Sequence, residues 1–533
     1  MRWADRGGRD AVSSWMGYHP DRNVRRALGS LKRVAVVAAL ATVCVGCTGW
    51  NEYLHNNFKV GPNYRPPCAA TAEHWIDSGN PNVHNTAPSD AAWWQTLNDP
   101  VLSSLIHTAY RQNLTLRVAG LRVMEARAQR GIAAGNLFPQ TQQATGGFLR
   151  TNSSKNTPTI APPYNFDQWQ VGTNLAWELD FWGRFRRAVE SADATLDASV
   201  ENYDDVLVLL LSDVAQRYVD VRTAQQRLEY ARKNVETQRE GLNLANLKFT
   251  NGATTRLDVT QGESTLGQTE ALIPPLESQE RQAMNQICIL LGVPPRDIND
   301  VLRGRQPIPS TPAEVALGIP ADLLRRRPDI RRAEREVAAQ SARIGVATSE
   351  LYPHFAITGA IYLDAANFKD LFSSNSFGGS IGPSFNWNIL NYGRLVNGIR
   401  VQDARYQQLA VTYRNIVLQA NAEVENGVVQ FLNAQRQLKF LTASTRAAEE
   451  SVGLVRSQYD AGKTDFNRVL IVEQALSQQQ DQLAATEGSV VQNLVQIYKA
   501  LGGGWQIRLD NSGDQTAAAV VQPSELIPAP APQ

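Results

Sequence analysis

The sequence predicts a membrane protein of mixed α and β structure that is internally duplicated. Three observations predict this fold class. Landmarks in the first half of the chain recur in the second half at a nearly constant spacing, which indicates two copies of one unit. Each copy contains a very long stretch with apolar residues every seven positions, as in a coiled coil. Each also contains a short segment in which apolar and polar residues alternate, as in a strand.

The N-terminus has the layout of a secretory signal peptide. Basic residues occur without acidic ones between Arg22 and Arg33, and the apolar run from Val34 to Gly46 ends in small residues. This run is too short to cross a membrane as a helix. We therefore predict a signal peptide at residues 1–46, with Met16 as an alternative start.

A lipid anchor is predicted directly after this signal. Cys44-Val-Gly-Cys47 resembles a bacterial lipobox, although Cys44 stands where the usual leucine would be. Cys47 would then carry palmitate at the start of an N-terminal segment covering residues 47–95. Ordinary signal cleavage without a lipid is the alternative. Cys68 and Cys288 are too far apart in sequence to be predicted as a disulfide.

Composition argues against several classes of function. The net charge of +1 gives no basic field for nucleic acid, and six scattered histidines form no metal or base pattern; His354 has no partner at a suitable spacing. Nucleotide-binding and nucleophile-elbow motifs are absent, so we predict no enzymatic activity, cofactor or metal site. The run Arg325–Arg327, before Pro328 at a helix start, is expected to form a charged rim, with an anion site as the alternative.

The repeat fixes the domain boundaries. Leu137-Phe138-Pro139 recurs as Leu351-Tyr352-Pro353 at an offset of 214, whereas Trp177 recurs as Trp387 at an offset of 210. The four-residue difference belongs in a loop between Pro139 and Trp177. The repeats are expected at residues 96–292 and 321–504, joined by a linker at 293–320. The tail at 505–533 is rich in Ala and Pro and is expected to be disordered.

The heptad pattern predicts a helix of unusual length. Val214, Val221, Leu228 and Val235 lie seven residues apart, and adding 210 preserves the pattern in the second copy. A helix from about Phe185 to Asn251 would extend about 100 Å and supercoil against its neighbours. A fibrous coiled coil would show the same pattern.

The alternating segments distinguish the chain from a simple fibre. From Trp169 to Leu179 the odd positions are mostly apolar and the even positions mostly polar, which predicts a strand with two unlike faces. Hairpins are expected at about 138–180 and 352–390, giving four strands. A soluble half-buried sheet would also alternate. Aromatic residues at the strand ends are expected to form a membrane-interface girdle: Trp177, Phe181, Trp182, Trp387 and Tyr392.

Four strands are too few to close a membrane barrel, and open edges are not tolerated in lipid. The chain is therefore expected to oligomerise, with two copies giving eight strands and three giving twelve. Only the larger number leaves an open lumen.

These features resemble the outer-membrane factors of tripartite efflux systems, of the TolC/OprM type and close to the NodT-like lipoproteins. Six motifs occur in the family's order: VGPNYRPP at 60–67, WWQTLNDPVL at 93–102, LFP at 137–139, ELDFWGR at 178–184, GIPADLLRRRPDI at 318–330 and LGGGW at 501–505. The resemblance implies a homotrimer with a twelve-stranded β-barrel continued by a helical coiled-coil barrel. The helices at 185–251 and 395–461 would be continuous, and shorter ones near 100–136, 255–291, 321–351 and 465–501 would lie beside them. The linker would form an equatorial collar.

The resemblance also implies a function. The trimer would conduct drugs or other small toxic solutes passively from the periplasm to the exterior, anchored to outer-membrane lipid. An inner-membrane RND-type pump would energise it through a periplasmic adaptor. A type I protein-secretion duct and a structural envelope tether are the alternatives.

In the resembled family the periplasmic tip closes through polar and acidic residues after the helix-ending glycines. Those glycines are Gly252 and Gly462, so the gate is expected within residues 254–263 and 464–473. Ile471 stands where relatives often carry aspartate, so this chain lacks that acidic side chain. The alternative is that the candidate residues are only solvated turn residues. The candidates are Arg256, Asp258, Asp465, Asn467 and Arg468.

Overall fold

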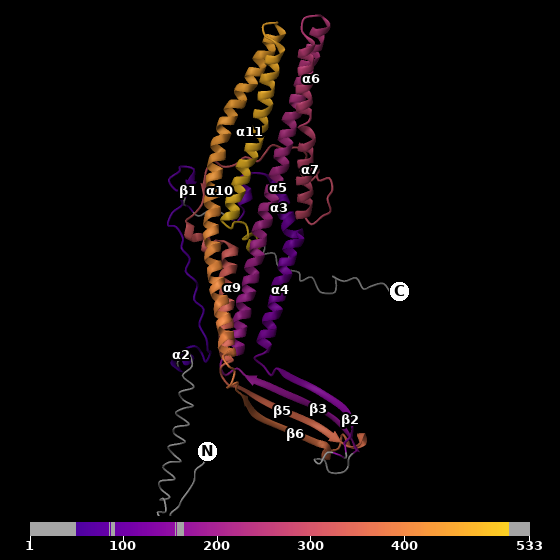
Figure 1. Ribbon diagram of the computed structural model, residues 1–533, viewed down its shortest axis with the longest axis vertical. Helices are drawn as coiled ribbons and strands as arrows, with labels where there is room; N and C mark the ends of the chain where they lie inside the picture. Colours follow the sequence, from indigo (N-terminus) through magenta and orange to yellow (C-terminus); the bar gives the residue numbers. More distant parts are fainter. Residues whose placement is uncertain (1–49, 85, 87–90, 155, 157–164, 511–533) are drawn as a thin grey trace, which may run out of the picture.

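A computed structural model describes residues 50–84, 86, 91–154, 156 and 165–510. The chain is elongated, with one small sheet at one end and the free turns of two helical hairpins at the other (Figure 1). The predicted mixture of helices and strands is confirmed, and helix predominates. The predicted signal peptide at 1–46, the anchor Cys47 and residues 511–533 of the tail lie outside the described residues.

The larger sheet contains four antiparallel strands in the order β2-β3-β5-β6. They are β2 (Thr141–Asn152), β3 (Asn165–Leu179), β5 (His354–Ala365) and β6 (Phe377–Asn386). The register places Val171 opposite Leu363, and Trp177 opposite Ile357, so the apolar positions of neighbouring strands share one face. β6 ends at Asn386, so Trp387 lies beyond the last strand rather than inside it.

Two helices of 67 residues form the long axis, α5 (Arg184–Thr250) and α10 (Arg394–Asp460). Each starts one residue before its predicted range and, at about 1.5 Å per residue, extends about 100 Å. Both begin after a glycine with φ of 81°, Gly183 in the first copy and Gly393 in the second. Residues that have a Cβ rarely adopt this backbone conformation. The two copies therefore enter their long helices through the same backbone turn.

The shorter helices are less regular than the repeat predicts. Residues 100–136 form two helices, α3 (Pro100–Gln112) and α4 (Leu114–Gly135), because the Asn113 side chain caps α4 by accepting from the Leu116 N–H at 2.8 Å. Residues 255–291 also divide, into α6 (Arg256–Glu270) and α7 (Ile273–Leu290). The second division follows from Pro274, which cannot donate a helical hydrogen bond.

The second repeat contains less interrupted helices. α11 (Phe466–Ala500) is continuous where the first copy divides into α6 and α7. α9 (Pro328–Ser349) follows two short turns, η2 (Pro320–Asp322) and α8 (Leu323–Arg326). Two further short turns, η3 (Phe368–Asp370) and η4 (Ser374–Ser376), connect β5 to β6.

The main core lies midway along the helices. Trp93 and Trp94 of the short helix η1 (Trp93–Leu97) are buried there beside Tyr218 of α5 and Phe431 of α10. A parallel pair of strands that the sequence did not predict, β1 (Val83–His84) and β4 (Val315–Ala316), ties the N-terminal segment to the linker. None of the described helices is long and apolar enough to span a membrane.

Two predictions about charged or terminal segments were wrong. Arg327 is not on an exposed rim: it is buried, with Nη2 2.7 Å from Asp329 and Nη1 2.7 Å from Glu423. The tail does not become disordered at residue 505, because α12 (Ile507–Asp510) follows it, Ile507 is buried, and Arg508 pairs with Asp204 at 2.8 Å. Both errors arose because one partner of each arginine is distant in sequence, Glu423 for Arg327 and Asp204 for Arg508.

We predict that Phe431→Ala destabilises the middle of the molecule by about 3–5 kcal/mol, because it leaves a cavity in a fully buried position. The measurement is the thermal unfolding midpoint of the purified protein in detergent. Phe431→Leu fills most of the cavity and is the control. Equal midpoints for the alanine variant and the parent would contradict the prediction.

Candidate functional site

The free turns of the hairpins hold the residues predicted to form a gate. In each turn a glycine with positive φ, Gly252 or Gly462, ends the long helix. The next N–H closes the turn by donating to a helical carbonyl, from Ala253 to Lys248 and from Lys463 to Gln458, each at 2.8 Å. This is the common glycine C-terminal cap, and it gives both copies the same tight turn.

The five candidate gate residues lie in the first turns of α6 and α11. Asp258 is half-buried and accepts from the Thr254 hydroxyl, and Asp465 caps α11 by accepting from the Arg468 N–H at 2.9 Å. Arg256, Asn467 and Arg468 are exposed. The structure thus joins candidates only within each turn, and it places the two turns at separate hairpin tips (Figure 1). Their role in gating stays a prediction.

A contact between the hairpins lies just below these tips. Arg456 of α10 donates to the Thr237 carbonyl of α5 at 2.5 Å, and its Nε is 3.1 Å from Glu473 of α11. Lys248 of α5 donates to the Tyr459 carbonyl of α10 at 2.7 Å and lies 3.5 Å from the centre of the Tyr459 ring. We call Arg456, Glu473, Lys248 and Tyr459 the latch.

Glu473 is the buried member of the latch, with 4% of its side chain exposed. Burial raises the pKa of Glu473, and Arg456 lowers it by less, so the net pKa lies above the ordinary value. For an acid with a raised pKa, the stabilisation is complete at low pH and is lost as pH rises through the folded-state pKa.

Sequence reasoning missed the latch, although one signal for it existed. Glu473 lies on the same helical face as the buried Val469, Leu470 and Leu476, a position where a charged residue is uncommon. Its repeat counterpart, Glu263, is exposed. Arg456 gives no comparable signal, because its partners on α5 are about 200 residues away.

The aromatic residues predicted as a girdle lie where the sheet joins the helices. The indole of Trp177 donates to the Leu137 carbonyl at 3.2 Å, and that of Trp387 donates to the Leu351 carbonyl at 3.0 Å. The repeated tryptophan thus binds the repeated Leu-x-Pro turn in both copies. Trp182 is also partly buried and donates to the Pro353 carbonyl at 2.8 Å.

The other two girdle candidates are exposed, Phe181 by 48% and Tyr392 by 95%. A second aromatic cluster, not predicted, lies at the far end of the sheet. Each ring contacts the next, with centroid separations of 4.4–6.2 Å. The four residues, in the order of these contacts, are Phe148, Trp169, Phe368 and Phe372.

His354 is less isolated than the sequence suggested. Its Nδ1 lies 2.9 Å from Glu178 and its Nε2 3.5 Å from Glu350, and Arg184 pairs with both carboxylates. Nothing in the described chain groups three His, Cys, Asp or Glu side chains so as to hold a metal ion. We interpret the cluster as a junction between β3, β5, α5 and α9.

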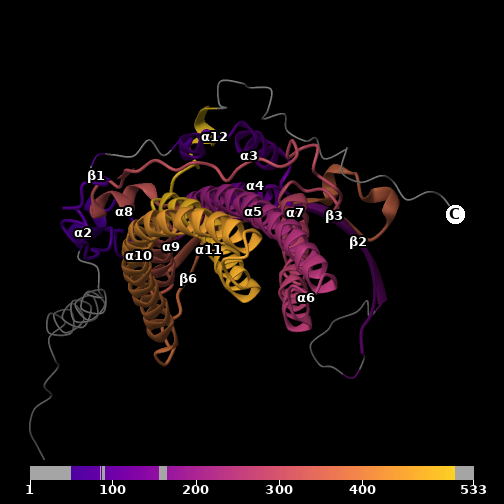
Figure 2. The same ribbon diagram turned by 90° about the horizontal axis from the view of Figure 1, so that it is seen from above.

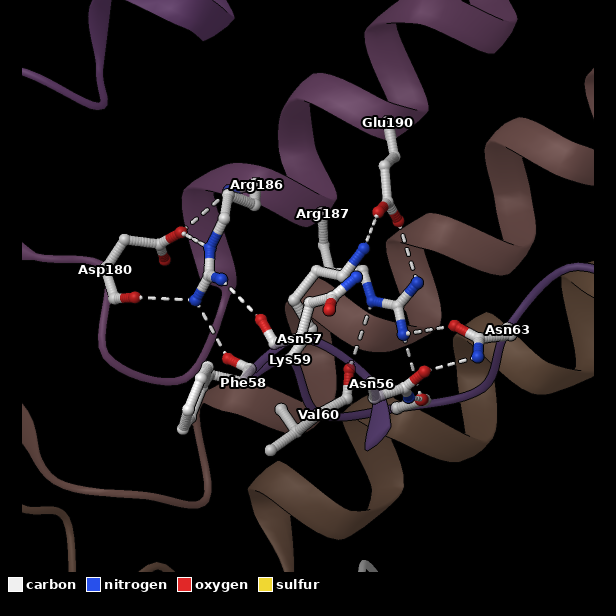
Figure 3. Close-up of polar contacts among 11 residues, drawn as sticks. Asn56, Asn57, Phe58, Lys59, Val60, Asn63, Asp180, Arg186, Arg187 and Glu190 are labelled. Carbon is white, nitrogen blue, oxygen red and sulfur yellow. Dashed lines mark hydrogen bonds and ion pairs between the residues drawn. The ribbon is translucent and has the colours of Figure 1, made fainter. Parts of the chain in front are cut away.

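The N-terminal segment follows the short helix α2 (Trp50–His55) and lies against the start of α5, where Figure 3 shows its polar contacts with Arg186 and Arg187. Arg186 donates to the carbonyls of Asn57 and Phe58 at 2.6 and 2.8 Å. Arg187 donates to the carbonyls of Val60 and Gly61 at 3.2 and 3.0 Å. We call residues 56–64 the strap.

Charge and shape complete the binding of the strap. Lys59 and Arg187 both pair with Glu190 (Figure 3). Burial raises the pKa of Glu190, but the two cations lower it by more, so the net pKa lies below the ordinary value. Gly61 has φ of 83°, and a Cβ there would lie 2.4 Å from Cα of Gly345. Gly61 is therefore required for the close contact between the strap and α9.

A sheet with one apolar face, joined to two helical hairpins about 100 Å long, defines an envelope channel protein with a helical extension. The outer membrane efflux protein family matches residues 105–293 and 319–503, and the chain belongs to this family. The predicted family, efflux function and outer-membrane location are confirmed.

Individual relatives agree with this assignment. Nodulation protein T of Rhizobium leguminosarum bv. trifolii is 31% identical over 83% of this chain and 92% of its own length. Pyoverdine export outer membrane protein OpmQ of Pseudomonas aeruginosa is 30% identical over 78% of this chain and 87% of its own. The structure is similar to that of the outer-membrane channel OprN, with a TM-score of 0.79, 30% identity and coverage of 84% and 99%.

We predict that Arg187→Ala releases the strap, because three strap acceptors, the carbonyls of Val60 and Gly61 and the Asn63 side chain, lose the buried guanidinium as their donor. Each unsatisfied buried group costs about 1–3 kcal/mol. The Val60 N–H, which donates to the Trp182 carbonyl at 3.1 Å, should then exchange at least about tenfold faster with deuterium. Arg130→Ala, which removes an exposed pair with Asp193, is the matched control and should leave this rate unchanged. Unaltered exchange in both variants would refute the role of Arg187.

We predict unequal effects from removing the two charges of the latch. Arg456→Ala leaves Glu473 buried without its cation and should destabilise the contact by about 3 kcal/mol at neutral pH, less at low pH where Glu473 is protonated. Glu473→Gln removes the buried charge and should be nearly neutral. Deuterium exchange of residues 237–250 and 456–473 at two pH values measures both effects. Equal effects from the two variants would be inconsistent with a costly buried carboxylate.

Proposed function

We propose that three copies of this chain close into a duct through which small toxic solutes, including drugs, pass passively from the periplasm to the exterior. Twelve strands would cross the outer membrane, and the helices would continue the duct into the periplasm. The observation that carries this proposal is that, within the described residues, both outer strands of the sheet, β2 and β6, have a partner on one side only. In lipid such edges must be paired, and a ring of copies pairs all of them.

The faces of the sheet support a position in the membrane. Apolar side chains such as Val171, Ile361, Ile381 and Phe385 are exposed in the single chain. Strands of 10–15 residues are long enough to cross a bilayer at a tilt, and aromatic clusters lie at both ends of the sheet. The polar face would line the lumen.

The helices next to the open strands support a head-to-tail ring. α4 precedes β2 and exposes Leu114, Val118 and Leu121, whereas α10 follows β6 and exposes Val411 and Leu418. Two unlike apolar edges fit the contacts of a cyclic oligomer, in which one edge meets the other edge of the next copy. Eight strands would be filled by side chains, so three copies are the smallest ring with a lumen.

An anchor and two partners complete the proposal. Cys47 would carry palmitate in outer-membrane lipid, and the similarity to the probable outer membrane lipoprotein SilC of Salmonella typhimurium supports this anchor. A periplasmic adaptor and an inner-membrane RND-type pump would bind the helical end and supply the energy. Relatives named for pyoverdine export and for toluene efflux support small molecules as cargo.

The hairpin tips would form the gate of this duct. Arg256, Asp258, Asp465, Asn467 and Arg468 would surround the opening, and the latch would hold the two hairpins of each copy in the closed arrangement. Release of the latch would let the α10–α11 hairpin move relative to α5.

The repeat predicts how neighbouring copies pair. Within the chain Trp177 pairs with Ile357. Adding 210 to Trp177 gives Trp387, and subtracting 214 from Ile357 gives Gln143, so Trp387 of one copy is expected opposite Gln143 of the next. In an antiparallel pair, Ser384 then lies opposite Gly146. Because the two hairpins differ in register by one residue, the partner lies within residues 145–147.

We therefore predict that Ser384→Cys, combined with one of Thr145→Cys, Gly146→Cys or Gly147→Cys, forms disulfide-linked trimers. The background carries Cys68→Ser, because Cys68 is exposed. Non-reducing gel electrophoresis after mild oxidation measures the product. In the pairs shifted by one residue from the true register, the two cysteine side chains lie on opposite faces of the sheet, so these pairs act as controls. Linked dimers with no trimer, or no product in any combination, would disprove the ring.

We predict that deletion of the protein increases susceptibility to antibiotics and dyes, and that restoring it reverses the change. The measurement is growth inhibition, together with co-purification of the adaptor and pump. If tolerance of every compound is unchanged while a secreted protein disappears from the medium, the chain is a protein-secretion duct. If the purified trimer conducts no ions in a bilayer even after Arg456→Ala, the tether is favoured.

A further inference from the structure

The helical layer has two faces that differ in what covers them. On one face of α5 and α9 lie the strap and residues 505–508: Tyr64 of the strap donates to Glu334, Trp505 stacks on Arg331, and Arg508 pairs with Asp204. Figure 2 shows the same arrangement, with α2, β1, α8 and α12 on one side of the curved layer of helices. The opposite face is free of these segments and is concave.

A groove of about 460 Å³ lies on this free face. Its walls come from four helices in spatial order, with Arg122 on α4, Ser199 on α5, Arg332 and Arg343 on α9, and Leu409 on α10. Side chains from all four helices can line one groove only on the concave side of the layer, where they point toward one another. The volume is in the range of sites that hold small molecules.

The groove has an excess of positive charge. It contains three guanidinium groups and one carboxylate, that of Glu336. Arg332 is neutralised by Asp205 at 3.0 Å and donates to Asn202 at 2.9 Å. Arg343 contacts only the Ser191 hydroxyl, at 3.3 Å, and Arg122 has no polar partner within the part of the chain that the structure describes. Two guanidinium groups are therefore available to a ligand.

We propose that this groove is a subsite for small organic anions, which it attracts through Arg122 and Arg343. A guanidinium offers a planar pair of donors that matches a carboxylate. Both arginines are exposed, so the interaction is weak enough for the anion to leave, as transit through a duct requires. The subsite rests on the proposed function in one respect: only in the ring does this face line a lumen, and three copies would then place nine arginines around it.

The test measures the electrostatic potential in the groove without requiring transport. Ser199→Cys is introduced in the Cys68→Ser background, and the purified protein in detergent reacts with two thiol reagents of similar size. One is the anionic 2-sulfonatoethyl methanethiosulfonate, and the other is the cationic 2-(trimethylammonium)ethyl methanethiosulfonate. The ratio of the anionic to the cationic rate should exceed that of a free thiol by at least about tenfold, because a positive cleft concentrates anions locally.

The variant Arg122→Gln/Arg343→Gln should lower this ratio about fivefold or more. Arg130→Gln, which changes an exposed arginine of α4 paired with Asp193 outside the groove, should leave the ratio unchanged. A ratio equal to that of the free thiol, or one insensitive to removal of Arg122 and Arg343, overturns the subsite. Failure of the disulfide-linked trimer would instead refute the ring, so the two proposals fail separately.

Discussion

Donation from buried arginines to backbone carbonyls is the interaction on which the rest of the structure depends. Two 67-residue helices provide a frame, but the strap, the linker and the C-terminal segment have little secondary structure of their own. Arg187 binds the strap, Arg222 donates to the carbonyls of Leu302 and Gly304 in the linker, and Arg327 donates to the Ala500 carbonyl. A guanidinium suits this task because it carries five donors and no acceptor, and irregular segments present carbonyls that would otherwise be unsatisfied.

The buried charges of Arg222 and Arg327 are compensated by different groups. Arg222 is fully buried without a carboxylate at ion-pair distance in the described chain, and its charge is balanced by carbonyl dipoles, by Gln225 at 2.8 Å and by the Tyr218 ring at 4.8 Å. For Arg327, burial lowers the pKa, but Asp329 and Glu423 raise it by more, so the net pKa exceeds its ordinary value. Truncating Arg222 would leave two linker carbonyls without their donor, and truncating Arg327 would leave the Ala500 carbonyl and two carboxylates without theirs. Either loss costs more than the loss of an exposed ion pair.

Periodicity predicted the frame well but not what attaches to it. The heptads placed α5 and α10 within one residue because a repeating apolar face is a local property of the chain. The breaks at Asn113 and before Pro274 were also visible as a capping residue and a proline, although the resemblance implied one helix over each of the ranges 100–136 and 255–291. Contacts of Arg187, Arg222 and Arg456 with partners 80 or more residues away could not be predicted, because no sequence pattern links a guanidinium to a particular carbonyl. Glu473 was predictable in principle as a carboxylate on an apolar helical face.

The contacts are distributed unevenly along the molecule, with more of them at the sheet end than near the hairpin tips. At the sheet end, Arg186 and Arg187 hold the strap, Arg184 joins Glu178 to Glu350, and three tryptophans bind carbonyls, so many independent contacts would have to break together. Toward the tips, the latch contains one buried carboxylate whose burial is already unfavourable for its charge. The first hairpin is divided before Pro274, while α11 is continuous, so the second hairpin can swing as a stiff unit once Arg456 is displaced. Under the proposed gate, opening at the tips would break fewer contacts than rearrangement at the sheet end.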